Sequence, residues 1–564
     1  GRVIDFFDPV LLASGATVGD LRADDLSVQF FETLALRAGA SVGTITIDGS
    51  GTSTDPGDIK FRVGDALTLG SGASLGAIFA SQQMTFDGEV FLGSGASVGG
   101  LTAGELVRFS DPVTLASGAA LAAGSGIQAG GSGVLFLDTL FLAEGSEVGA
   151  IAGSGALSFA AIEGSGNGSI GAITSLQSGI TQTGNLTLGS GGSIGAITGG
   201  AVSGSGDVVL GDGATVLVGS GGSLGAIAGG DVLLHELTLA RAASVGAITV
   251  DEDSIEFSGA LILGADSSIG DLLAGSGADN INFSGTVSLG SGASLGSISV
   301  RGSGNADVIF RGDLTLDSGA SIGSIEVTGS GDSDIRFSGT VDLGTKAGIS
   351  AMFAVDDIRF RDLLSLSGGA SIGSLTASGA VTSDATFSGV VDLGRQASLG
   401  SITTSNDIRF SSALQLASGA SIGDLVVFDD ILFEDNVVLG SGATVGSLTA
   451  SGAGSGGSDL RLKGDLTLRP GAAMGALFAS DDLELQGAVL LGSGASLGSI
   501  TGQNGVTFGS TVTLDPFAIL GSGNTIDGGS GGVVFSNMLT LGEASVVGDI
   551  VGSGAISFQA IDGS

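Results

Sequence analysis

Leu-Gly-Ser-Gly-Ala-Ser-Leu-Gly-Ser-Ile occupies residues Leu289 to Ile298, and close copies of this decapeptide recur along the whole chain. With Val or Ile allowed for the second Leu, copies lie at Leu69 to Ile78, Leu92 to Leu101, Leu439 to Leu448 and Leu491 to Ile500. Including weaker copies, the apolar residue before the last Gly of the motif, Leu295 in the copy that begins at Leu289, marks about 22 repeats, many of them 23 residues long. A period in this range is typical of architectures in which repeats stack on one another.

Within one repeat, apolar and polar residues alternate in short runs, as in Asp357-Ile358-Arg359-Phe360 and Leu364-Ser365-Leu366. Such alternation predicts brief β-strands, and the Gly and Ser residues between the runs predict tight turns. Because one short repeat cannot bury its own apolar face, the repeats must stack. We therefore predict an all-β fold with almost no helix: residues 1–564 form a single long parallel β-solenoid (β-helix) of about 22 coils. Its core repeat is about 23 residues, and short insertions such as Gly329 to Ser333 form loops at one corner.

Phenylalanine recurs at one phase of the repeat. In stacked coils these rings would form an internal ladder with a spacing of about 4.8 Å. The predicted core ladder consists of Phe257, Phe283, Phe310, Phe337, Phe360, Phe387, Phe410 and Phe433.

A longer repeat pairs residues 65–165 with residues 464–564 at an offset of about 399 residues. The match is close between 130–165 and 529–564, where both copies end in an Ala-Ile-(Glu or Asp)-Gly-Ser sequence. In the first copy the pattern continues into another repeat. We expect the sequence to be a segment of a longer polypeptide.

The composition excludes several kinds of partner. The chain has 57 acidic and 18 basic residues, a net charge of -39, so nucleic acid and anionic membrane surfaces would be repelled. No apolar run reaches the roughly 20 residues needed to span a bilayer, so no membrane insertion is expected. With no Cys, the chain has neither disulfides nor thiolate metal sites.

An Asp precedes the Phe-bearing strand in many repeats, and a stack of carboxylates would repel unless solvated, paired or bridged by a hard cation. Calcium is therefore a possible cofactor, with the candidate ligands Asp279, Asp307, Asp334, Asp357, Asp384, Asp407 and Asp430. The alternative is that each Asp caps a turn and stays in water, with no cofactor bound. Arg336, Arg359 and Arg409 follow three of these Asp residues by two positions, and their charges would partly neutralise the column.

Signals for catalysis are weak. His235 is the only histidine, and a triad or a His-based metal site would need partners that the sequence lacks. The frequent Gly-Ser-Gly segments are turns, because a phosphate loop requires a following helix. Residues Gly275 to Ile281 resemble part of the RTX calcium nonapeptide, but a single copy assigns no site. We predict that the protein is not an enzyme and has no catalytic residue, no cofactor-binding residue and no small-molecule substrate.

By its Leu-Gly-Ser-Gly-Ala-Ser-Leu-Gly repeats and its composition, the chain resembles secreted bacterial β-solenoid repeat proteins of surface fibres, surface layers and adhesin stalks. The resemblance implies an extracellular or cell-surface location and assembly into a homopolymer. The predicted function is that of a self-assembling structural protein. The alternative is an adhesin stalk that presents a binding tip outside this segment.

Overall fold

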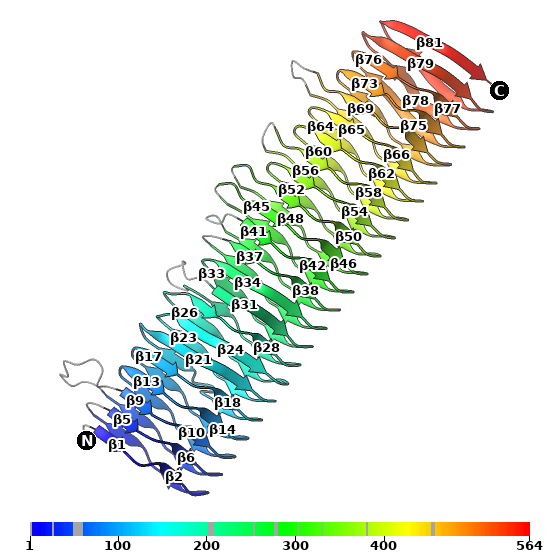
Figure 1. The fold of residues 1–564 in the computed structure, drawn as a ribbon. Coiled ribbons are helices and arrows are strands. Elements are labelled where there is room, and N and C mark those ends of the chain that lie inside the picture. The colour runs from blue at the N-terminus through cyan, green and yellow to red at the C-terminus, as the bar shows by residue number, and fades with distance from the viewer. Residues whose placement is uncertain are drawn as a thin grey trace. The chain divides into compact units, whose positions relative to one another are not determined.

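The computed structural model describes residues 3–24, 27–48, 60–200, 208–251, 254–275, 280–302, 304–329, 331–379, 382–452 and 457–563. It divides into two compact units, unit 1 (Gly1–Ala278) and unit 2 (Asp279–Ser564). Within each unit the chain winds as a parallel β-solenoid (Figure 1), and the described residues contain no helix. There are about 22 turns with a repeat of about 24 residues, which confirms the predicted fold class.

Most coils of unit 2 contribute four short strands, whereas in the last coils some strands merge into long ones such as β75 (Ser496–Gly502) and β79 (Gly532–Leu541). In one coil the four short strands are β45 (Asp307–Phe310), β46 (Leu314–Leu316), β47 (Ser321–Ile322) and β48 (Ile325–Val327). The first two strands belong to one parallel sheet, which we call the Phe sheet, and the last two belong to a second, which we call the Ser sheet. Neighbouring coils pair in register, so that like residues face each other along the stack, as Phe310 and Phe337 do.

Unit 1 is built in the same way. One of its coils consists of β13 (Gln83–Phe86), β14 (Val90–Leu92), β15 (Ser97–Val98) and β16 (Leu101–Ala103). In a few coils the two strands of the Phe sheet merge into one long strand, as in β21 (Gly133–Leu142). The register of that strand shifts between Phe136 and Thr139, where a bulge replaces the usual corner.

The core lies between the two sheets and is filled by the inward residue of each alternating pair. In unit 2 the rings of successive Phe residues stack 4.5 to 5.1 Å apart and within 11° of parallel, in the series Phe283, Phe310, Phe337, Phe360, Phe387, Phe410 and Phe433. Phe257 belongs to unit 1 and is 1% exposed. Leu462 and Leu485 take the ring position in the next two coils of unit 2.

Most insertions fall at the corner between the last Ser-sheet strand of one coil and the first Phe-sheet strand of the next, as predicted. Residues 122–126 are an exception, since they lengthen the bend between the Ser-sheet strands β19 (Ala120–Leu121) and β20 (Ile127–Ala129). At the usual corner, seven positions of the sequence separate the end of β48 at Val327 from the next strand at Ile335, whereas only residues 405–407 separate β60 (Ile402–Thr404) from the strand that begins at Ile408. In each coil of unit 2, one Phe-sheet strand follows this corner. These strands are β41 (Asn280–Phe283), β45, β49 (Ile335–Phe337), β53 (Ile358–Phe360), β57 (Ala385–Phe387), β61 (Ile408–Phe410), β65 (Ile431–Phe433), β69 (Leu460–Leu462), β73 (Asp482–Leu485), β76 (Gly505–Phe508), β79 (Gly532–Leu541) and β81 (Ala555–Gly563).

The Ser-sheet strands of unit 2 are two or three residues long over eight successive coils. They are β43 (Ser294–Leu295), β44 (Ile298–Val300), β47, β48, β51 (Gly348–Ile349), β52 (Met352–Ala354), β55 (Ser371–Ile372), β56 (Leu375–Ala377), β59 (Ser398–Leu399), β60, β63 (Ser421–Ile422), β64 (Leu425–Val427), β67 (Thr444–Val445), β68 (Leu448–Ala450), β71 (Ala473–Met474) and β72 (Leu477–Ala479).

Candidate functional site

The Asp residues that begin or precede the first Phe-sheet strands of unit 2 form a continuous column. We call this the Asp column, and it comprises Asp307, Asp334, Asp357, Asp384, Asp407, Asp430, Asp459 and Asp482. Six of the seven predicted calcium candidates belong to it, and the seventh, Asp279, lies outside the described residues. Asp459 and Asp482, which the sequence pattern places at the same phase of the repeat, complete the column.

Hydrogen bonds join successive members of the Asp column. The Oδ1 atom of each Asp accepts the backbone N–H of the next, at 2.8 Å from Asp334 to Asp357 and at 2.9 Å from Asp407 to Asp430. The same bond, 2.6 to 3.0 Å long, recurs at every step from Asp307 to Asp482. Asn280 provides the same acceptor for the Asp307 N–H, at 2.9 Å. Each carboxylate therefore satisfies a backbone donor at the start of the strand in the next coil.

Arginine neutralises part of the Asp column. Arg336 binds Asp334 through Nε at 2.8 Å and reaches Asp307 at 3.2 Å. Arg359 pairs with Asp357 and lies 3.7 Å from Asp334. These contacts explain how the carboxylates of Asp334 and Asp357 can be buried, since a buried charge requires an ionic or hydrogen-bonded partner.

The pairing that we expected between Arg409 and Asp407 is not the one that forms. Arg409 instead binds Glu434, with the guanidinium nitrogen 2.5 Å from the carboxylate oxygen. Glu434 lies at the corner that follows β65, in the next coil, and an extended Arg side chain reaches along the stack as readily as along its own strand. Asp407 is thereby left without this expected neutralisation.

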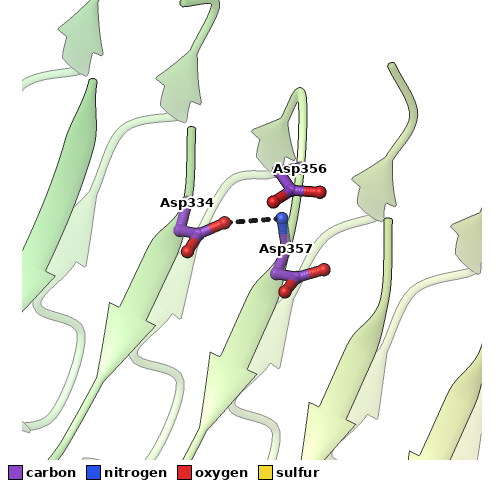
Figure 2. A group of neighbouring side chains, drawn as sticks. All are labelled: Asp334, Asp356 and Asp357. Carbon is purple, nitrogen blue, oxygen red and sulfur yellow. Dashed lines mark hydrogen bonds between the residues drawn. The ribbon is translucent and has the colours of Figure 1, made fainter. Parts of the chain in front are cut away.

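Among the described residues, three groups of carboxylates, each made of two members of the Asp column and one neighbouring Asp, lie close enough to share a cation. They are Asp334, Asp356 and Asp357; Asp407, Asp429 and Asp430; and Asp459, Asp481 and Asp482, each with ligand oxygens within 4.8 Å of one another. Figure 2 shows the first group, with Asp334 accepting the N–H of Asp357 and Asp356 beside them. Sequence analysis missed Asp356, Asp429 and Asp481, although the Asp-Asp pairs at this phase of the repeat were a usable signal.

Two of these groups are partly neutralised by Arg, and the remaining group is not. Arg336 and Arg359 pair with the first group and Arg461 pairs with Asp459 of the third, at 2.5 Å. In the part of the chain that the structure describes, Asp407, Asp429 and Asp430 form no ion pair with Lys or Arg. Calcium binding stays a prediction for the Asp column, and the group of Asp407, Asp429 and Asp430 is the best placed for it, because three oxygen ligands of the kind that calcium prefers converge there without a basic partner among the described residues.

Burial and crowding alter the acidity of this group. Burial raises the pKa of Asp407, the N–H of Asp430 lowers it in part, and the negative charge of Asp384 adds to the rise. Burial also raises the pKa of Asp429, and the neighbouring Asp430 raises it further. The same main cause, burial, raises the pKa of Asp356 and Asp482 in the other two groups.

These shifts predict that mild acid stabilises unit 2. A carboxyl whose pKa is raised by folding binds its proton more tightly in the folded state, so stability rises as the pH falls through the folded pKa. The gain is complete below the unfolded value of 3.8. We expect the thermal midpoint to rise between pH 7 and about pH 4, and the rise to be smaller in Asp429→Asn. A midpoint that falls steadily over this interval would contradict the prediction.

Removing one carboxylate should separate its two roles. Asp334→Ala leaves the N–H of Asp357 without its acceptor and removes a partner of Arg336, so we expect a loss of about 1 to 3 kcal/mol. Asp334→Asn keeps an oxygen for the N–H and should cost less. Urea unfolding followed by circular dichroism measures both. Equal losses in the two variants would show that the ion pair, and not the backbone hydrogen bond, carries the effect.

Removal of divalent cations should leave the fold intact. The Oδ1 atoms of the Asp column are already bonded to backbone N–H groups, so the strands do not need a cation to satisfy these donors. We expect EDTA to leave the β-sheet circular dichroism signal and the thermal midpoint unchanged. A midpoint lowered by several degrees, and restored by added calcium, would instead show that the group of Asp407, Asp429 and Asp430 holds a structural ion.

His235, the single histidine, lies on β34 (Val232–Leu239) of unit 1 and is half-buried. Its Nδ1 atom is 3.0 Å from the hydroxyl oxygen of Ser258, at the corresponding edge of the next coil. The contact links two neighbouring coils.

Comparison with family models, with curated proteins and with solved structures found no match to this chain. The described residues include no helix that could cross a membrane. What classifies this chain is its fold alone, a parallel β-solenoid.

Proposed function

We propose that the protein is a self-assembling, extracellular or cell-surface structural protein. It would form a fibre, sheath, tube or surface layer through stacking and lateral packing of β-solenoids, with further copies of itself as partners. In this proposal the protein is not an enzyme. The observation that carries the proposal is the in-register repetition of outward-facing residues along the Ser sheet.

The repetition is clear in the first Ser-sheet strand of successive coils. Its outward residue is Ser321, then Gly348, then Ser371, then Ser398 and then Ser421, each paired with the next. A surface that repeats at the strand spacing of about 4.8 Å can make the same contact many times with a second periodic surface. Contacts that are weak singly then add up, as in other multivalent binding.

The chemistry of the same surface supports a structural role. A groove of about 570 Å³ runs along it and is lined by Ser, Gly, Ile and Leu residues between Ile349 and Gly423. These side chains include no general acid or base and no charged group that would orient a substrate.

Electron microscopy of the native material tests the proposal. We expect ordered polymers, and we expect the purified chain to form them again as its concentration rises. Particles that stay monomeric at every concentration would contradict the proposal and favour the adhesin stalk, whose binding tip lies outside this segment.

A further inference from the structure

The charged side chains of unit 2 are unevenly divided between its two sheets. From β43 to β72 the Ser-sheet strands carry one charged residue, Glu326, and the bends between paired strands carry one, Asp424. The Asp424 carboxylate accepts the N–H of Ser447 at 2.8 Å. The Phe-sheet strands of unit 2 from β41 to β74 (Val489–Leu491) carry Asp307, Arg336, Asp342, Arg359, Asp392, Arg409, Arg461, Asp482 and Glu484.

The outer surface of the Ser sheet is also shaped for close approach. Between most of the paired strands the chain bends at a Gly, with Ser350 in this place between β51 and β52, and a Cβ at Gly373 or Gly400 would collide with the backbone of the preceding coil. Gly373, Gly400 and Gly423 line the groove that runs from Ile349 to Gly423. Without side chains at the bend, another backbone can come close to this surface.

We propose that the outer surface of the Ser sheet between β43 and β72 is the surface through which two copies of this chain pack face to face. The inference rests on the proposed function and names the surface that performs it. Two copies that each carry a net charge of -39 repel one another wherever their charged surfaces meet. This surface, with Glu326 and Asp424 as its only charged residues, is where that repulsion is weakest.

The size of the surface fits a stable contact between two copies. Eight coils spaced about 4.8 Å apart, each presenting about seven residues of nearly extended chain, offer about 800 Å² per copy. A standard protein–protein interface buries about the same area on each partner.

Cysteine labelling locates the contact, because the natural chain has no Cys. Thr376→Cys and Thr403→Cys place a thiol at half-exposed outer positions of β56 and β60. Gln415→Cys, on β62 (Leu414–Leu416) of the Phe sheet, is the matched control. We expect assembly to slow maleimide labelling of the two Ser-sheet cysteines at least tenfold and to leave the control unchanged.

Added charge supplies the second measurement. The double variant Thr376→Asp with Thr403→Asp should shift the concentration at which polymers sediment at least tenfold upward, whereas Ser365→Asp with Gln415→Asp on the Phe sheet should not. Circular dichroism checks that both variants fold. If either variant does not fold, the cysteine labelling alone tests whether the Ser sheet is the contact surface.

Polymers whose Ser-sheet cysteines label as fast as in monomers would overturn this inference and leave the proposed function standing. Protection of these cysteines in molecules that sediment as monomers would overturn it in favour of a segment of the same chain as the occupant. A wild-type chain that never associates would overturn the inference and the proposed function together.

Discussion

Phe360→Ala should lower the free energy of unfolding of unit 2 by about 3 to 5 kcal/mol, the usual cost of deleting a buried aromatic ring. Phe360 is 1% exposed, and its ring stacks on Phe337 at 4.8 Å and on Phe387 at 5.1 Å. The substitution leaves a cavity and also breaks the ladder, so two stacking contacts are lost. Urea unfolding followed by circular dichroism measures the loss.

Phe353→Ala is the matched control. Phe353 is the middle, outward residue of β52, the strand that precedes β53 in the chain, and it is half-exposed. We expect its removal to change stability by no more than about 0.5 kcal/mol, as for most surface substitutions. Equal losses at Phe353 and Phe360 would contradict the assignment of the ring ladder to the core. Stacked repeats need not unfold in one step. The free energies of unfolding of the two variants are therefore compared for the same unfolding transition.

Gly373→Ala should destabilise unit 2 by about 3 kcal/mol, at the upper end of the usual range for overpacking. A Cβ at this bend would fall on the carbonyl oxygen of Ser350 and lie 2.7 Å from its carbonyl carbon. Backbone atoms of the preceding coil cannot rotate away as a flexible side chain can. The two coils would have to move apart, and the paired strands on either side of the bend would lose hydrogen bonds. The thermal midpoint and urea unfolding report the change.

Gly368→Ala provides the same chemical change five residues earlier, at the turn between the two sheets. The nearest atom to its new Cβ is the carbonyl oxygen of Arg395 at 3.5 Å, an ordinary van der Waals contact. We expect a change of less than about 1 kcal/mol, in either direction. If Gly373→Ala is tolerated as well as Gly368→Ala, the bend is not set by backbone contact between coils.

The sequence alone was sufficient to predict the order of elements inside one coil. In Asp357-Ile358-Arg359-Phe360 the alternation places Ile358 and Phe360 on one side of the strand and Arg359 on the other, and the structure buries the first two. A strand has a fixed two-residue period, so the pattern holds whatever the neighbouring coils do. The corner at which most insertions occur was predictable for a related reason, because extra residues are tolerated best where no strand pairing is interrupted.

The charged groups were less predictable, because their partners come from other coils. Arg409 binds Glu434, 25 residues away, although Asp407 lies closer in the chain. Asp429 and Asp481 join the Asp column from the variable corner, where the path of the chain does not follow from the repeat. A long side chain reaches across the distance between stacked strands, so its choice of partner depends on the residues above and below it.

The sequence by itself determined the strand period, the stacking of like residues and the buried Phe ladder, since each follows from alternation repeated in register. Only the tertiary structure decided that there are two sheets, that the Asp carboxylates accept N–H groups from the next coil, and that charge gathers on the Phe sheet. The physical reason is that these features depend on where each corner turns and on which side chains then meet, and both arise between coils rather than within one.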